Sequence, residues 1–170
     1  MQSAPGGVIP AYVAFGANLG EPVETLRAAA VALGRRPGVE LVAGSPVYRT
    51  RPIGPPGQPD YANAVARVET THEPEALLDV LHAVEAEFGR VRDVRWGPRT
   101  LDLDLIWYDG EERTDERLTL PHPRAHEREF VLRPLAELAP ALPLAGATVA
   151  ELLAALPPQG VRATASPLMP

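Results

Sequence analysis

Two aspartates at alternate positions are the residues of this 170-residue sequence best placed to support chemistry. They are Asp102 and Asp104, at the end of the segment R-W-G-P-R-T-L-D-L-D that spans residues 95–104. In a β-strand, side chains two positions apart point to the same face, about 6–7 Å apart along the chain. Neighbouring carboxylates repel each other unless a cation lies near them, and Mg²⁺ prefers one or two carboxylates completed by water and phosphate oxygens. The spacing therefore favours a magnesium site over an exposed strand face, because aspartate is depleted from strands.

Four arginines lie just before this pair, in a segment that also contains Gly97 and Pro98. A guanidinium group binds phosphate oxygens bidentately and stays charged at any relevant pH. Arginines beside a magnesium site suit phosphoryl transfer, which depends on positioning and charge neutralisation. A solvated run of charge is the commoner role of such a segment, but the adjacent carboxylates favour phosphate binding. The four residues are Arg90, Arg92, Arg95 and Arg99.

Aromatic and amide side chains could bind a planar ligand. Trp96 lies among the arginines, where it could pack against the protein or stack on a ligand, and the sequence leaves both open. Tyr61 and Asn63 share one face of a predicted strand and supply a ring and an amide with donor and acceptor groups. Core packing is the alternative for Tyr61. Together they could hold the edge and the face of a heterocycle.

A proline-flanked histidine follows further along the chain. His122 lies between Pro121 and Pro123, which restrict its backbone, and His126 comes four residues after it. This spacing could indicate zinc, but Pro123 argues against a continuous helix and no third ligand is evident. We therefore predict that His122 faces phosphate.

Composition excludes several classes of protein. All sixteen basic residues are arginine, which removes a Walker-type lysine and Schiff-base chemistry, and the absence of cysteine removes thiol nucleophiles and disulfides. The formal net charge of −6 argues against a general binder of nucleic acid or anionic membranes. An RNA-binding domain is further disfavoured by an aromatic content of 5%. No signal sequence or membrane span is apparent, so we expect a cytoplasmic protein.

Hydrophobic periodicity and Pro/Gly boundaries predict the elements that must position these side chains. The order of strands and helices predicts a single α+β domain over residues 1–157, with a loose lead-in over 1–10 and a disordered tail over 158–170. Its sheet should be largely antiparallel and covered by helices. Strands are expected at 11–15, 39–43, 47–50, 61–70 and 102–108, and helices at 22–34, 74–89, 133–138 and 149–156. The turn signal Asp109-Gly110 predicts that a strand near 118–120 pairs with the strand over 102–108 as a hairpin.

The sequence resembles the 6-hydroxymethyl-7,8-dihydropterin pyrophosphokinases of folate biosynthesis. The segment at 95–104 is the most specific match, and the resemblance extends from Tyr12 to Pro140 in family order. It implies a ferredoxin-like α+β sandwich that transfers pyrophosphate from ATP to the hydroxymethyl group of the pterin and releases AMP. The alternative is a non-catalytic regulatory module that binds magnesium nucleotide. The other matching segments are F-G-A-N-L-G at 15–20, Y-R-T-R-P-I-G at 48–54, Q-P-D-Y-A-N-A at 58–64 and L-T-L-P-H-P-R-A-H-E-R-E-F-V-L at 118–132.

The resemblance also implies roles for individual residues, with ATP as co-substrate, two Mg²⁺ ions and a monomeric enzyme that binds neither nucleic acid nor membrane. Asp102 and Asp104 would bind the metal, and with Arg90 and Arg99 they would be catalytic. The ATP-binding residues implied are Arg92, Arg95, Arg99, Leu105, Arg117, Thr119, His122 and Arg128. The pterin-binding residues implied are Thr50, Ile53, Tyr61, Asn63, Glu85, Trp96 and Phe130.

Overall fold

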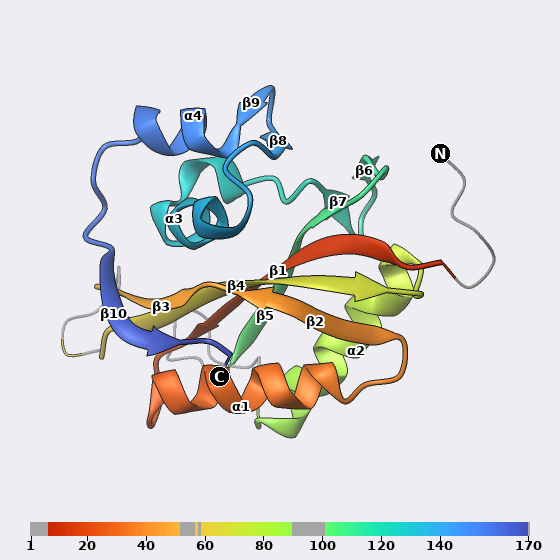
Figure 1. Ribbon diagram of the computed structural model, residues 1–170. Helices are drawn as coiled ribbons and strands as arrows, with labels where there is room; N and C mark the ends of the chain where they lie inside the picture. The colour runs from red at the N-terminus through yellow and green to blue at the C-terminus, as the bar shows by residue number, and fades with distance from the viewer. Residues whose placement is uncertain (1–6, 52–56, 58, 90–100, 170) are drawn as a thin grey trace.

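A mainly antiparallel sheet with helices on both faces forms the protein, as the computed structural model shows (Figure 1). The structure describes residues 7–51, 57, 59–89 and 101–169. The single α+β domain with a ferredoxin-like arrangement is thereby confirmed. In chain order the main elements are β1 (Ile9–Ala17), α1 (Pro22–Gly34), β2 (Val39–Gly44), β3 (Pro46–Thr50), β4 (Tyr61–Thr70), α2 (Pro74–Glu87), β5 (Asp102–Tyr108), α3 (Glu129–Leu138), α4 (Val149–Ala155) and β10 (Arg162–Pro167). Short elements are β6 (Arg113–Thr114), β7 (Thr119–Leu120), a 3₁₀ turn (Ala125–Glu127), β8 (Pro143–Leu144) and β9 (Ala147–Thr148).

The sheet has the strand order β10-β3-β4-β1-β5, with β2 also paired to β4. β2 and β3 follow one another along the same edge of β4, and Ser45 lies between them. The Val65 N–H donates to Ser45 Oγ at 3.0 Å, which keeps the interruption bonded to the sheet. β5 is the other outer strand of this order, and Ile106 has no partner in its register with β1. The strand that carries the aspartate pair thus lies at a sheet edge.

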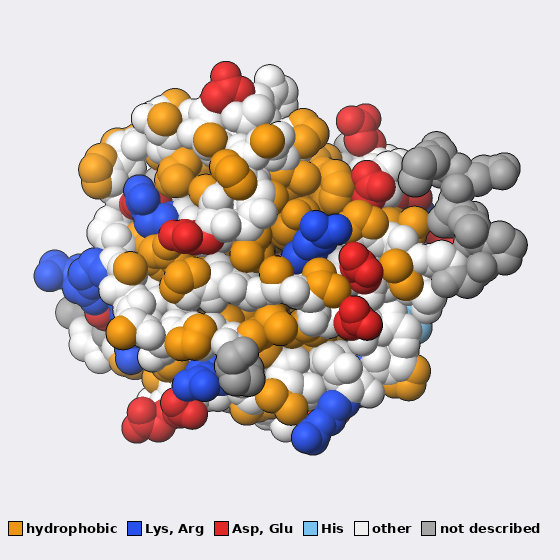
Figure 2. Space-filling view, in the orientation of Figure 1, with side chains coloured by type: hydrophobic (Ala, Val, Ile, Leu, Met, Phe, Trp, Pro, Cys, Tyr) orange, Lys and Arg blue, Asp and Glu red, His pale blue; other side chains and the backbone are white. Residues whose placement is uncertain are grey.

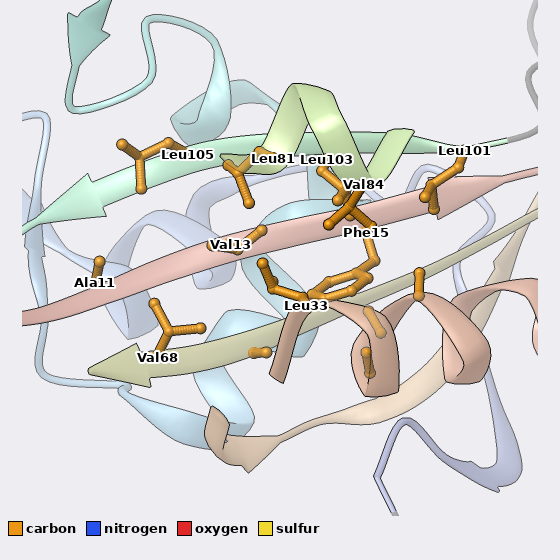
Figure 3. Close-up of a cluster of buried hydrophobic side chains, with 14 of the residues drawn as sticks. Ala11, Val13, Phe15, Leu33, Val68, Leu81, Val84, Leu101, Leu103 and Leu105 are labelled. Atoms are coloured by element: carbon orange, nitrogen blue, oxygen red, sulfur yellow. The ribbon is translucent and has the colours of Figure 1, made fainter. Parts of the chain in front are cut away.

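Each face of the sheet has its own hydrophobic core. Alternate residues of β1, among them Val13 and Phe15, pack with α1 and α2, as do Leu103 and Leu105 of β5 (Figure 3). Tyr12, which points to the opposite face of β1, packs with α3 and α4. Because strand side chains alternate, Asp102 and Asp104 point away from the α1–α2 core.

Proline at the first position and glycine at the end delimit the predicted helices. α1 begins at Pro22 and ends at Gly34, and α2 begins at Pro74, as the sequence predicts. α4 has a capping box, in which the Glu151 N–H donates to Thr148 Oγ1 and the Thr148 N–H donates to the Glu151 carboxylate. These local signals explain why helix positions are readable from the sequence.

Charged side chains of both signs are interspersed on the face drawn in Figure 2. Among the described residues shown there, no extended field of one sign builds up, and such a field is what non-specific nucleic-acid binding uses. Within the described parts of the chain, no helix has the length and apolarity needed to cross a membrane.

Two expectations about the second half of the chain are wrong. The segment over 158–170 was expected to be disordered, yet residues 162–167 form β10, which pairs with β3 (Figure 1). Local composition cannot reveal this pairing, because its partner lies more than a hundred residues away. The strand near residues 118–120 was expected to pair with the strand over 102–108. It pairs instead with β6, in register Arg113 to Leu120.

Replacing Leu168 with alanine is expected to lower the free energy of unfolding by about 2 kcal/mol. Leu168 is 1% exposed and belongs to the core on the α1–α2 face, so truncation leaves a cavity there. Denaturant unfolding measures the change, and Leu19→Ala is the control because Leu19 is 39% exposed. Equal stabilities of the two variants would show that the segment after α4 does not contribute to the core.

Candidate active site

Three residues on adjacent strands form a row across one face of the sheet. Asp102 of β5 lies opposite Gly16 of β1, and Gly16 lies opposite Asn63 of β4. We call these three residues the cross-strand row. Neighbouring strands are about 4.8 Å apart, so Asp102 and Asn63 lie about 10 Å apart with only a glycine between them. In the next row Asp104 lies opposite Ala14, so the β1 residues beside the carboxylates are small. We call this strip of the sheet face, from Asp102 and Asp104 across Gly16 and Ala14 to Asn63, the trough.

The amide of Asn63 is held in one orientation. Asn63 is buried, and its Nδ2 donates to Thr50 Oγ1 at 2.9 Å. Its Oδ1 lies toward Gly16, where an added Cβ would come within 3.4 Å of it. Asn63 thus presents a carbonyl acceptor to the trough.

The two carboxylates fit Mg²⁺ by the chemistry of their donors. Asp104 is exposed and Asp102 is half-buried, on one face of a strand. In the described segments there is no group of three or more His, Asp or Glu side chains that could enclose a metal ion. Mg²⁺ is commonly bound by one or two carboxylates, with the remaining positions filled by water and substrate phosphates. The pair therefore suits a metal that shares its ligands with a phosphate substrate.

His122 lies beside this pair. The backbone N–H of His122 donates to the Ile106 carbonyl at 2.9 Å. Its ring Nδ1 accepts from the backbone N–H of Arg124 at 3.2 Å. The pKa of His122 is lowered from its usual value, chiefly by burial. The Asp104 carboxylate opposes this decrease, and the guanidinium groups of Arg128 and Arg124 add to it. The acceptor role of Nδ1 places the proton of the neutral ring on Nε2, which makes Nε2 a donor beside the aspartates and arginines.

A cation and a ring meet at the start of α3. The Arg128 guanidinium carbon lies 5.6 Å from the centre of the Phe130 ring, a cation–π contact. Phe130 is half-buried and packs against the core under α3 and α4. This corner offers a positive charge and an aromatic side chain near His122.

Three residues assigned from the resemblance have other environments. Glu85 is 2% exposed, and its Oε2 accepts from the Leu103 N–H at 2.9 Å, so its carboxylate holds the backbone between the two aspartates. Leu105 is buried in the α1–α2 core, and its side chain does not face the trough. Arg117 forms an ion pair with Asp79 of α2. The sequence could not place these side chains, because their partners lie on other elements.

Other assigned residues lie at the margins of the site or outside the described residues. Tyr61 is the first residue of β4 and lies opposite Thr50. Thr119 is in β7, half-buried, opposite Thr114. The residues outside the described ranges are Ile53, Arg90, Arg92, Arg95, Trp96 and Arg99.

The structure adds residues that sequence reasoning did not assign to the site. Gly16 separates Asp102 from Asn63 in the strand register, and Ala14 lies opposite Asp104 and packs against the α3–α4 core. Their signal in the sequence was the matching segment F-G-A-N-L-G for Gly16 and small size for both. Tyr48 extends the cross-strand row beyond Asn63, and its hydroxyl donates to Glu137 Oε1 at 2.7 Å. Burial first, and then the bond to Glu137, raise the pKa of Tyr48 to about 12, so this link between β3 and α3 stays protonated at neutral pH.

Two carboxylates that suit Mg²⁺ and an adjoining His–Arg corner provide the charges that an enzyme needs to transfer phosphate groups from a metal-bound nucleotide. Comparison with known families narrows that class. The model of the family 7,8-dihydro-6-hydroxymethylpterin-pyrophosphokinase (HPPK) matches residues 12–140, most of the chain. The chain belongs to this family.

Curated relatives agree over almost the whole length. The chain is 52% identical over 152 residues to the 2-amino-4-hydroxy-6-hydroxymethyldihydropteridine pyrophosphokinase of Pseudomonas aeruginosa, covering 88% of this chain and 93% of that one. It is 52% identical over 132 residues to the enzyme of the same name from Haemophilus influenzae, covering 78% and 82%. It is 46% identical over 151 residues to that of Methylorubrum extorquens, covering 89% and 96%.

Solved structures support the fold. A structure of HPPK-DHPS in complex with substrates matches with a TM-score of 0.68 at 12% identity, covering 86% of this chain and 43% of that one. Wild-type Plasmodium falciparum HPPK-DHPS with STZ-DHP matches with a TM-score of 0.67 at 12% identity, with the same coverage. This chain therefore spans less than half the length of those chains. At such identity the likeness shows the fold alone.

Proposed function

We propose that the trough is where this chain performs the reaction of its family, transfer of a pyrophosphoryl group from ATP to 6-hydroxymethyl-7,8-dihydropterin. The hydroxymethyl oxygen forms a bond to the β-phosphorus of ATP. The bond between that phosphorus and the oxygen it shares with the α-phosphorus breaks, AMP leaves, and the hydroxyl proton is lost. The family membership and the relatives support this reaction.

The pterin half of the trough is assigned to β3, β4 and the start of α3. A pterin ring carries N–H donors along one edge, and Asn63 Oδ1 could accept a hydrogen bond from one of them. The Nδ2 of the same amide donates to Thr50 Oγ1 and so keeps Oδ1 in place. Tyr61 and Phe130 would bound the ring, and Gly16 leaves the floor free for it. Ile53 and Trp96, which lie outside the described residues, stay predicted members of this pocket.

The phosphate half is assigned to β5 and its surroundings. Asp102 and Asp104 would hold two Mg²⁺ ions, and bound Mg²⁺ supplies charge neutralisation along the phosphate chain. His122, through Nε2, and Arg128 would donate to phosphate oxygens. Thr119 stays a predicted ATP contact, as do Arg90, Arg92, Arg95 and Arg99, which lie outside the described residues. Arg117 would have to exchange its ion pair with Asp79 for a phosphate.

The observation that carries this proposal is the cross-strand row, which sets the Asp102 carboxylate and an oriented amide about 10 Å apart across a glycine. Such a separation lets a flat ring and a phosphate chain bind side by side. A binding module for nucleotide alone would not need the second half of this row.

The decisive experiment incubates the purified chain with ATP, Mg²⁺ and 6-hydroxymethyl-7,8-dihydropterin, and separates the products by liquid chromatography. We expect AMP and a pterin diphosphate in equal amounts, and no turnover when Mg²⁺ or the pterin is left out. ADP with a monophosphate ester would contradict the reaction type. Nucleotide binding without pterin-dependent turnover would instead support a regulatory module.

Replacing Gly16 with valine is expected to raise KM for the pterin about tenfold, since each methyl group in the trough occupies volume that the ring needs. An added Cβ has only ordinary contacts, 3.4 Å to Asn63 Oδ1 and 4.0 Å to the Ala62 carbonyl, and valine suits a strand, so the variant should fold. Steady-state kinetics with pterin varied at saturating ATP measure the effect. An unchanged KM for pterin would place the ring elsewhere.

A further inference from the structure

The strand β10 lies outside residues 12–140, the range that the family model matches, yet it is bonded to the strand that carries Thr50. Ala163 of β10 lies opposite Tyr48 of β3. The Thr164 hydroxyl donates to the Val47 carbonyl at 2.6 Å, which adds a side-chain bond to the strand pairing. Figure 1 shows β10 alongside β3 at the edge of the sheet. β10 therefore supports β3 from the side opposite to β4.

β10 also holds the residue that precedes β4. Arg162, the first residue of β10, donates through a terminal guanidinium nitrogen to Asp60 Oδ2 at 2.6 Å. Asp60 is directly followed by Tyr61, the first residue of β4. From the other side, the fully buried Asn18 donates through Nδ2 to the Pro59 carbonyl at 3.3 Å. The chain is thus fastened on two sides just before it enters the pterin half of the trough.

We propose that Arg162 and Asp60 form a latch by which β10 positions Tyr61 and Asn63 for the pterin, which makes Arg162 a positioning residue. The proposal rests on the proposed function, because it assigns the latch to the pterin half of that site. An ion pair with side chains 54% and 34% exposed adds little to global stability. Its loss should therefore leave the fold intact. Because Asp60 directly precedes Tyr61, the loss should weaken pterin binding, whereas ATP binding at β5, at the opposite edge of the sheet order, should be spared.

The test compares Arg162→Gln, Asp60→Asn and the double variant with Arg36→Gln. Arg36, just after the end of α1, pairs with Glu87, the last residue of α2, with side-chain exposures of 31% and 49%. It is therefore a matched control away from the trough. We expect each latch variant to raise KM for the pterin about threefold to fivefold, the scale of an exposed ion pair. KM for ATP should stay within twofold. The double variant should be no worse than either single one, and Arg162→Lys should recover part of the loss.

Equal increases in both KM values together with a lower melting temperature would overturn the latch, since they would show a merely structural role. An unchanged KM for pterin in an enzyme whose parent is active would also overturn it. Hydrogen–deuterium exchange at residues 61–63 provides a readout that does not depend on turnover. We expect exchange there to be several-fold faster in Arg162→Gln than in the parent, and unchanged in Arg36→Gln. If the parent chain lacks pyrophosphoryl transfer, the proposed function fails, while unchanged exchange in Arg162→Gln would reject the latch.

Discussion

Replacing Asp102 or Asp104 with asparagine is expected to lower kcat by on the order of 10³-fold or more, about 4 kcal/mol of transition-state stabilisation. Both carboxylates lie on one face of β5, and we assign them to the metal ions that neutralise the phosphate chain during transfer. An amide keeps the shape of the side chain but loses its negative charge, so Mg²⁺ binds weakly and the phosphate charge is left without a counter-ion. Single-turnover formation of AMP across a range of Mg²⁺ concentrations measures this loss.

Stability separates this effect from misfolding. Asp104 is exposed and lies on the same face as a second carboxylate, so removal of its charge relieves repulsion, and the melting temperature of Asp104→Asn should not fall. Asp109→Asn is the matched control, because Asp109 is exposed just beyond the end of the same strand. Near-normal turnover by a folded Asp104→Asn variant would remove the carboxylate pair from the mechanism.

Much of the fold could be predicted from local signals in the sequence. β4 and β5 have the predicted bounds 61–70 and 102–108, because side chains two positions apart in a strand share one face of the sheet and this period is visible in their residues. The start of α2 at Pro74 is equally readable, since proline favours the first helical position. The same alternation predicted that Asp102 and Asp104 share a face.

Contacts between segments that lie far apart in the sequence could not be predicted. The pairing of β10 with β3 depends on hydrogen bonds between distant segments and on the burial of Leu168. The Pro- and Ala-rich composition of the tail shows neither, and it suggested disorder instead. The cross-strand row depends on the register of three strands, which sets Gly16 between Asp102 and Asn63 and which no local pattern states. The resemblance predicted which residues bind the substrates but did not show which of them touch.

Glu85 shows the consequence of that distinction. The resemblance assigned it to the pterin, but its buried carboxylate accepts from the N–H of Leu103, the residue between the two aspartates. Leu103 lies on an outer strand of the sheet order. We therefore propose that Glu85 acts through Asp102 and Asp104, by holding the backbone that carries them. Groups that orient metal ligands in this way commonly contribute 10-fold to 100-fold to metal affinity or activity.

Replacing Glu85 with alanine is accordingly expected to raise the Mg²⁺ concentration for half-maximal activity about 10-fold to 100-fold. It should also lower the free energy of unfolding by about 1–3 kcal/mol, because the buried Leu103 N–H loses its acceptor. Glu85→Gln keeps an oxygen that can accept this bond, so its Mg²⁺ requirement should change much less. Glu87→Ala is the control on the same helix, since Glu87 is exposed and pairs with Arg36. If Glu85→Ala loses stability but keeps the Mg²⁺ requirement of the parent, the role of Glu85 is limited to the folding of β5. If Glu85→Ala raises the requirement and Glu85→Gln largely restores it, the buried hydrogen bond supports the metal site.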